Sequence, residues 1–258
     1  MTVRLSTGMR NGMAARLGFA AMLNKGYINV YTGAQPASAD AAATGTLLGT
    51  FSASSGALTK ETRATGSIQL TGGASGSVNT VTVGGLNIIP DGAVAFNTSL
   101  NQTASDLCDA INRNGMFEAT VSTDTVTIKG RPGTGVTTAA VSSTLTTITA
   151  SYVNMGSGVA GVAPVNGLIL GVEASGVIAK PSSQVWSFAG VAAGTAGWAR
   201  FYSSDGGDSG ILLSGAPWYP RLDGTCGVGS GDFQLSTLAI TVGLPVTLDT
   251  FSWTQPAS

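Results

Sequence analysis

The chain has 258 residues, of which 43% are hydrophobic and only 10% are charged; the net charge is −1 and there is no histidine. The lack of histidine excludes Ser-His-Asp triads, Cys-His pairs and histidine-ligated zinc. The near-neutral charge balance excludes a general electrostatic affinity for nucleic acid, which needs a basic surface. We therefore expect a non-enzymatic protein without a cofactor, whose weakly charged surface is largely covered by neighbouring subunits.

The first 26 residues have the clearest helical pattern. Their spacing predicts a helix over residues 6–24, capped by Ser6 or Thr7 and followed by a capping glycine at Gly26. This helix either docks on its own domain or forms an arm that reaches a neighbouring subunit. We expect the arm, with assembly contacts made by an apolar stripe and two basic side chains: Met9, Met13, Leu17, Arg10 and Arg16.

Short alternating strands and Gly-rich turns make up most of the remaining chain. Strands are expected over residues 27–31 and 47–52, and after an interruption over residues 167–172, 184–190, 197–202, 233–241 and 246–254. This pattern is typical of a mainly β protein, and we expect a β-sandwich of the jelly-roll or immunoglobulin-like type. We expect the large aromatic side chains to fill the core of this sandwich; the alternative is a platform on which sugars stack. These side chains are Trp186, Phe188, Trp198, Phe251 and Trp253.

The interruption predicts a small inserted α+β domain over residues 65–163, built as β-β-α-β-β. A helix capped by Asn101 or Thr103 is followed by a hairpin that turns at Thr123-Asp124, and an extended return reaches residue 155. Three domains follow: an N-terminal helical arm (1–26), a discontinuous sandwich (27–64 plus 164–258) and the insertion (65–163).

Two cysteines, Cys108 and Cys226, lie far apart without the spacing of a metal or redox motif, so we expect free thiols in a reducing compartment. The apolar run over residues 17–23 is interrupted by Gly18 and is too short for a signal-peptide core. No stretch predicts a transmembrane helix, and no membrane partner is expected.

Several segments carry a resemblance to a family of tailed-bacteriophage virion structural proteins. The run Tyr-Ile-Asn-Val-Tyr-Thr-Gly-Ala-Gln-Pro-Ala-Ser-Ala-Asp over residues 27–40 resembles the start of that family. The similarity continues over residues 44–48, 176–180, 194–202, 221–225 and 235–251, and the insertion resembles a module of phage structural and tail proteins. The resemblance implies a virion location after assembly in the host cytoplasm, with copies of itself and other virion proteins as partners.

Acidic, Gly-rich turns offer one candidate metal site. Asp205, Asp208 and Asp223 supply oxygen ligands of the kind that calcium prefers, although turn-forming Asp-Gly pairs explain them more simply. Paired carboxylates for glycoside hydrolysis are not indicated by any spacing.

We expect a homo-oligomeric structural subunit on the capsid exterior or the head–tail neck: a decoration, collar or connector-associated protein. The alternative is a tail or baseplate adhesin whose inserted domain binds a host glycan or receptor.

Overall fold

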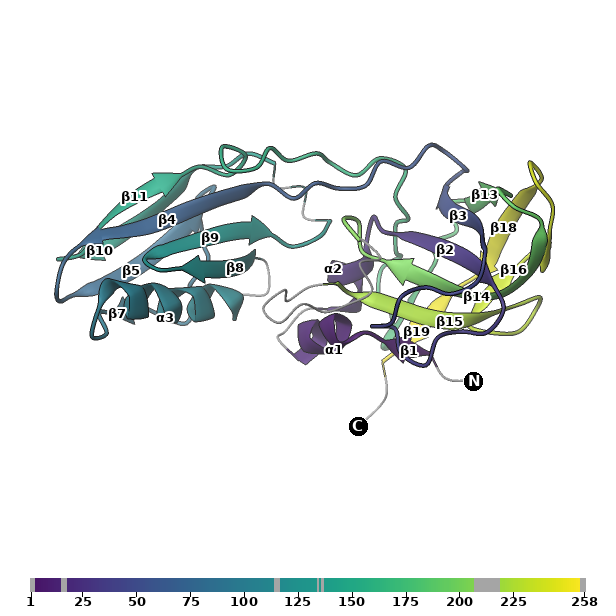
Figure 1. The fold of residues 1–258 in the computed structure, drawn as a ribbon, viewed down its shortest axis with the longest axis horizontal. Coiled ribbons are helices and arrows are strands. Elements are labelled where there is room, and N and C mark those ends of the chain that lie inside the picture. Colours follow the sequence, from purple (N-terminus) through teal and green to yellow (C-terminus); the bar gives the residue numbers. More distant parts are fainter. Residues whose placement is uncertain are drawn as a thin grey trace. The chain divides into compact units, whose positions relative to one another are not determined.

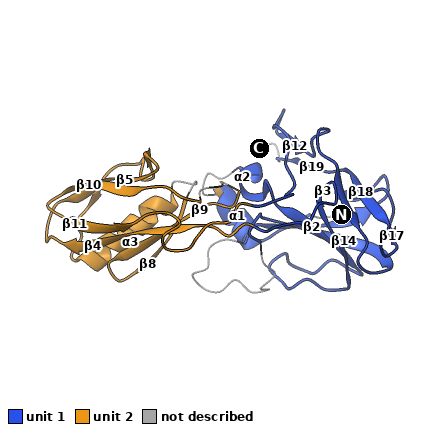
Figure 2. Cartoon of the chain, turned by 90° about the horizontal axis from the view of Figure 1, so that it is seen from above, with its two compact units in different colours: residues 1–13, 18–60, 164–258 blue, residues 14–17, 61–163 orange. Residues whose placement is uncertain are grey.

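The computed structural model describes residues 3–14, 18–113, 117–133, 135, 137–206 and 219–255. The protein is mainly β, and the chain divides into two compact units (Figures 1 and 2). Unit 1 is drawn from residues 1–13, 18–60 and 164–258, and unit 2 from residues 14–17 and 61–163. The segment predicted as an insertion, 65–163, lies within unit 2.

Unit 1 is built around a closed barrel of seven strands in the order β15-β16-β18-β13-β3-β2-β14, with β14 pairing back to β15. All neighbours are antiparallel except β15 and β16. The barrel strands are β2 (Tyr27–Thr32), β3 (Leu47–Ala53), β13 (Trp186–Ala189), β14 (Gly194–Tyr202), β15 (Arg221–Gly227), β16 (Phe233–Leu235) and β18 (Pro245–Thr250). Four short strands accompany it: β1 (Arg4–Leu5) on β15, β17 (Ala239–Ile240) on β14, and the pair β12 (Val177–Ala179) and β19 (Ser252–Thr254).

The predicted two-sheet sandwich is therefore not confirmed. Alternation and spacing reveal the strands themselves, but strand pairing decides between a sandwich and a barrel. Here β14 pairs with β2 on one side and with β15 on the other, and this second pairing closes the sheet on itself.

Aromatic side chains fill the barrel. Phe51 meets Phe188 edge-on at 4.7 Å, and Phe201 and Phe233 lie 5.7 and 5.4 Å from Phe251. A Cβ atom on Gly49 would lie 2.0 Å from the Phe188 ring, so only glycine fits there. Trp186, Phe188 and Phe251 lie in the core as predicted. Trp198 is also buried, but on the opposite face of β14, and Trp253 is only partly buried and stacks on Phe19 at 4.9 Å.

The N-terminal segment does not form the single predicted helix. It contains α1 (Thr7–Ala14) and α2 (Phe19–Leu23), separated by Gly18 in extended conformation, while residues 15–17 lie outside the description. Ser6 caps α1 as expected, since its Oγ accepts the Met9 N–H at 3.1 Å. The predicted arm is also corrected in part, because β1 pairs with β15 and Met9 is fully buried.

Two further expectations in unit 1 change. The left-handed residue after α2 is Lys25, with φ 60°, while a Cβ on Gly26 would lie 2.0 Å from the Tyr202 carbonyl oxygen. Gly26 therefore allows close packing and is not the left-handed residue, although its N–H donates to the Leu23 carbonyl at the end of α2 at 2.9 Å. The predicted strand over residues 167–172 is reduced to an isolated bridge between Leu168 and Gly26.

Unit 2 encloses its own core between two antiparallel sheets and a helix. One sheet has the order β11-β4-β9-β8, and the other has β10-β5-β6 with β7 on β5. The elements are β4 (Thr65–Gly72), β5 (Ser77–Val83), β6 (Leu86–Asn87), β7 (Val94–Ala95), α3 (Leu100–Asn112), β8 (Phe117–Ser122), β9 (Thr125–Gly130), β10 (Val141–Thr146) and β11 (Thr149–Val153). The core includes Ile68, Leu70, Val81, Leu107, Ile111, Val126 and Ile128.

The predicted helix and hairpin of unit 2 are confirmed. Strands β8 and β9 pair from Phe117 opposite Gly130 to Ser122 opposite Thr125. The helix cap is Ser99 instead of Asn101 or Thr103, because the Ser99 Oγ accepts the backbone N–H of Gln102 at 3.2 Å. The segment predicted as an extended return forms β10 and β11.

Candidate functional site

The face of β2, β14 and β15 that points away from the barrel core carries buried polar and aromatic side chains. Strand β14 lies between the other two, and the register places their side chains side by side in rows. In the order β2, β14, β15 these rows are Tyr27–Tyr202–Arg221, Asn29–Arg200–Asp223 and Tyr31–Trp198–Thr225.

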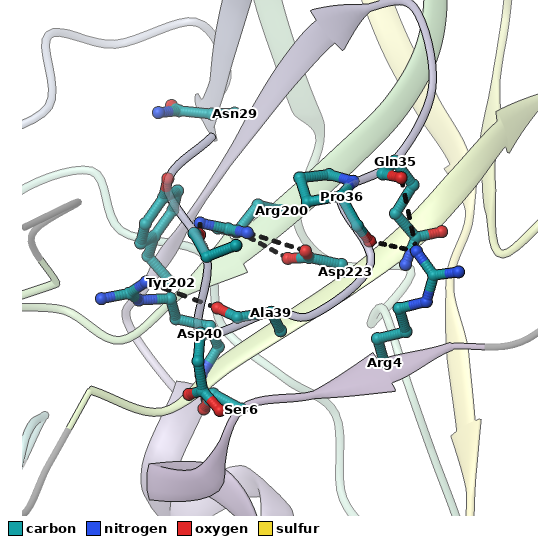
Figure 3. A network of polar contacts seen from close by, with 12 residues as sticks. Arg4, Ser6, Asn29, Gln35, Pro36, Ala39, Asp40, Arg200, Tyr202 and Asp223 are labelled. Carbon is teal, nitrogen blue, oxygen red and sulfur yellow. Dashed lines mark hydrogen bonds and ion pairs between the residues drawn. The ribbon is translucent and has the colours of Figure 1, made fainter. Parts of the chain in front are cut away.

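An ion pair occupies the middle of this array. The Arg200 guanidinium donates from Nε to Asp223 Oδ1 at 2.6 Å and from Nη2 to Oδ2 at 2.8 Å (Figure 3). Both side chains are 0% exposed. Two parallel charge-assisted hydrogen bonds satisfy the carboxylate, which is the condition for keeping such a pair in a low-dielectric interior.

Three arginines tie the segment between β2 and β3 to this array (Figure 3). Arg200 Nη1 donates to the Ala41 carbonyl at 2.9 Å, Arg221 Nη1 donates to Ala39 at 3.3 Å, and Arg4 donates to the Pro36 carbonyl. Asp40, in the same segment, accepts from the backbone N–H and hydroxyl of Thr7 at the start of α1. The Gln-Pro-Ala-Ser-Ala-Asp run and the adjacent Ala41 are therefore held by two buried arginines and the half-buried Arg4, and the run has an architectural role.

Aromatic rings complete the seal. Tyr27 stacks on Tyr202 at 4.9 Å and Tyr31 on Trp198 at 4.7 Å, while the Arg200 guanidinium lies 5.4 Å from the Trp198 ring. All of these side chains are buried. Because its polar groups bond to one another and to the 35–41 segment, we interpret the array as structural.

A second charge cluster lies in unit 2. Arg63 Nη1 donates to Glu118 Oε2 at 2.6 Å and to the Gly130 carbonyl at 3.1 Å, and both charged side chains are 7% exposed. Arg131 is also buried, and this burial lowers its pKa to about 10; the charge of Glu118 raises the pKa and that of Arg63 lowers it further. Glu118 is thus the carboxylate between cationic groups.

A hollow of about 220 Å³ lies beside Glu118 on the outer face of the β11-β4-β9-β8 sheet. The register explains its walls, since Thr65, Lys129 and Glu118 are direct neighbours across β4, β9 and β8. The residues that line it include one acidic, one basic and three hydroxyl side chains, although most of the lining surface is apolar: Thr65, Glu118, Ala119, Thr120, Thr127, Lys129 and Val159. This hollow thus places the buried charge of Glu118 beside an opening to solvent.

A larger groove in unit 1, of about 400 Å³, is mostly apolar and is lined by residues of α2, β12 and β19, including Phe19, Val177 and Trp253. Two of its residues, Gly18 and Gln255, adjoin segments outside the described ranges. Its full lining is therefore not defined.

An exposed apolar patch lies at three loops of unit 1. Val191, Val242 and Leu244 are 63%, 60% and 57% exposed. Their backbones meet at Gly190, whose N–H donates to the Leu244 carbonyl at 3.0 Å and whose carbonyl accepts from Gly243 at 2.8 Å. Leu47 borders the patch, because the Val191 N–H donates to the Leu48 carbonyl. We call these four residues, Leu47, Val191, Val242 and Leu244, the apolar patch.

The residues predicted to make assembly contacts differ in their exposure. Met9 is fully buried, Met13 is half-buried, and Arg10 is exposed with its guanidinium on the Thr7 hydroxyl at 3.0 Å. Arg16 and Leu17 lie outside the described residues. Of the stripe, Arg10 and Met13 are therefore the described side chains that a partner can reach.

The predicted calcium ligands do not converge. Both oxygens of Asp223 are taken by Arg200 inside the protein, and Asp205 accepts the Ser203 hydroxyl at 2.9 Å. Asp208 lies outside the described residues. Within the described ranges, no three His, Cys, Asp or Glu side chains gather as metal ligands would.

Both cysteines are free thiols. Burial raises the pKa of Cys108, and it raises the pKa of Cys226 to about 12. Both thiols are thus protonated near neutral pH.

The Glu118 cluster and the apolar patch were missed by sequence reasoning. Glu118 and Lys129 are each the single charged residue of their strand, and their direct pairing in the hairpin brings them together. The patch has a weak signal: three segments without a charged residue, 44–50, 189–195 and 238–247.

Comparison with known proteins adds no assignment, since no family model, curated protein or solved structure matches the chain. None of the helices in the described ranges has the length and apolar character needed to cross a membrane.

Proposed function

We propose that the chain is a non-enzymatic structural subunit of a tailed-bacteriophage virion, which acts by burying its surface against copies of itself and other virion proteins. The resemblance to phage structural proteins supports the virion assignment; it covers residues 27–40, 44–48, 176–180, 194–202, 221–225 and 235–251. The capsid exterior or the head–tail neck is the proposed position.

The apolar patch is the observation that carries the assembly role. Exposed clusters of large aliphatic side chains mark interaction sites on soluble proteins. The segments around this patch contain no charge that would oppose burial. Because the seven strands of the barrel close on themselves, unit 1 has no open barrel edge to extend by strand pairing. Side-chain contacts at the patch therefore offer the barrel a route to association that does not depend on strand pairing.

The N-terminal segment has a reduced part in this proposal. Ser6 Oγ accepts the Arg221 N–H at 2.9 Å and donates to the Tyr219 carbonyl at 2.9 Å, so it belongs to the folded unit. Deleting residues 1–26 would remove these interactions and confuse a loss of assembly with a loss of folding. Surface substitutions are the cleaner test.

The test replaces Val242 with Lys in the full chain and measures oligomeric state by sedimentation velocity and incorporation by mass spectrometry of purified virions. Val172→Lys is the matched control, because Val172 is 90% exposed and is not part of the patch. We expect Val242→Lys to dissociate the oligomer and reduce incorporation, while Val172→Lys leaves both unchanged. Unchanged assembly of Val242→Lys would refute the role of the patch.

A second candidate function is host adhesion through unit 2, and the hollow beside Glu118 favours it. Immunogold labelling of virions with an antibody against residues 65–163 separates the two positions. Label on the head or neck supports the structural proposal, and label confined to the distal tail supports adhesion.

A further inference from the structure

We propose that the hollow beside Glu118 in unit 2 is a binding site for a neutral, hydroxyl-rich ligand, namely a single saccharide ring. This inference goes beyond the assembly role, because it concerns residues of unit 2 that the apolar patch does not include.

The chemistry of the lining matches a sugar. The ion pair with Arg63 uses Oε2 of Glu118, which leaves Oε1 as an acceptor for ligand hydroxyls. Lys129 supplies donors, and the hydroxyls of Thr120 and Thr127 both donate and accept. Val159 adds an apolar contact for the C–H groups of the ring. A sugar ring carries alternating hydroxyl and C–H groups, and a lining with both polar and apolar groups can contact both kinds.

The charges of the site disfavour ions. An anion would meet the carboxylate of Glu118, and a cation would meet Lys129 with the Arg63 guanidinium behind it. Either ion would be placed near a like charge where water is partly excluded, which is costly. A neutral ligand has no such conflict and can use both charged groups as strong hydrogen-bonding partners.

The site is held in place before any ligand arrives. Glu118 is fixed by Arg63, which is itself anchored on the Gly130 carbonyl, and the two strands that carry Glu118 and Lys129 form a regular hairpin. At about 220 Å³ the hollow is smaller than the roughly 300–1,000 Å³ of pockets for drug-sized ligands, so it fits one ring.

The surrounding face continues the same chemistry. The next rows of the sheet outward from the hollow pair Ser67 with Thr127 and Thr120, and Gln69 with Thr125 and Ser122. These are uncharged, hydrogen-bonding side chains, so further rings of a chain could lie across them.

The experiment measures saturation-transfer difference NMR of the full chain with methyl glycosides of glucose, galactose, mannose and N-acetylglucosamine. Inorganic phosphate and methylammonium serve as charged competitors. Thr120→Arg fills the hollow from an exposed position, and Ser122→Arg is its matched control, placed two residues along the same strand outside the lining. Glu118→Gln tests the carboxylate, with amide exchange of both strands used to check that unit 2 stays folded.

We expect weak binding of at least one glycoside, lowered about tenfold or more by Thr120→Arg and unchanged by Ser122→Arg. Absence of binding by every glycoside overturns the proposal. So does binding that survives Thr120→Arg, or that phosphate or methylammonium displaces. Failure here leaves the assembly proposal untouched, since that proposal is tested at Val242 by sedimentation.

Discussion

The two charge clusters use the same chemistry in different surroundings. In unit 1, Arg200 and Asp223 are joined by two hydrogen bonds under stacked rings of Trp198 and Tyr202. In unit 2, Arg63 and Glu118 are joined through one carboxylate oxygen beside a hollow that reaches solvent. The first pair satisfies itself completely, whereas the second leaves an oxygen and a neighbouring ammonium group for something else.

This difference indicates what each cluster is for. A chain with so few charged residues places three arginines on the 35–41 segment, where they replace the water that its carbonyl groups would otherwise need. Glu118 also offsets the charge of two buried arginines, Arg63 and Arg131, but unlike Asp223 it lies beside a hollow. Unused hydrogen-bonding capacity at the edge of a hollow is typical of ligand sites.

The largest effect on stability should come from breaking the buried ion pair between Arg200 and Asp223. Arg200→Met leaves the Asp223 carboxylate buried without its partner, and we expect a loss of about 3–5 kcal/mol in the free energy of unfolding. Urea denaturation followed by tryptophan fluorescence measures this in unit 1, because all four tryptophans lie after residue 185.

Arg10→Met is the control for Arg200→Met, since Arg10 is exposed and its removal should cost less than about 0.5 kcal/mol. Replacing both partners, Arg200→Met with Asp223→Leu, should recover part of the stability. A loss of under 1 kcal/mol for Arg200→Met would contradict the structural role of the array.

A smaller effect is expected from Glu118→Gln in unit 2. The substitution removes the negative charge of Glu118 from its ion pair with Arg63, but water from the adjacent hollow can replace the lost interaction, so we expect a loss of about 1–3 kcal/mol. Amide hydrogen exchange of β8 and β9 measures it locally. A loss as large as that of Arg200→Met would mean that the two clusters are equally sealed and would remove the contrast between them.

Local patterns predicted the elements of unit 2 well. The helix over Leu100–Asn112 has apolar positions at Leu107, Ala110 and Ile111, and the hairpin that follows alternates strictly, so neighbouring residues decide the structure. Both features are short-range, and they follow from helical and strand periodicity.

The barrel and the N-terminal segment depended on distant residues. Closure of the barrel requires β14 to pair with β15, and the sequence of neither strand indicates which strand it pairs with. The stripe containing Met9 was read as a surface for other proteins, because an amphipathic pattern is the same whether it docks on its own chain or on a neighbour. The start of this segment is fixed by residues more than 200 positions away, because Ser6 hydrogen-bonds to Tyr219 and Arg221.

The candidate sites were hidden for a similar reason. Along β14 the residues Trp198, Arg200 and Tyr202 alternate with the core residues Ala199 and Phe201. Because large aromatic residues flank Arg200 on its own face, this pattern indicates that the arginine is buried. That signal would have identified the sealed array. Glu118 and Lys129 lie on either side of the hairpin turn predicted at Thr123-Asp124, whose register places them opposite each other; the two residues could have been paired from that turn.

The smallest stability effect, and the sharpest distinction, belongs to Lys129→Gln. Lys129 is only half-buried, and we expect its replacement to change the free energy of unfolding by less than about 0.5 kcal/mol. Its ammonium group lines the hollow, so the same substitution should weaken glycoside binding severalfold while the strands keep their hydrogen exchange protection. A residue that only stabilised the sheet would lower protection without a separate effect on binding. Loss of binding at unchanged stability would therefore show that Lys129 contacts a ligand. Loss of both together would mean that the cluster around Glu118 has a structural role, like the pair of Arg200 and Asp223.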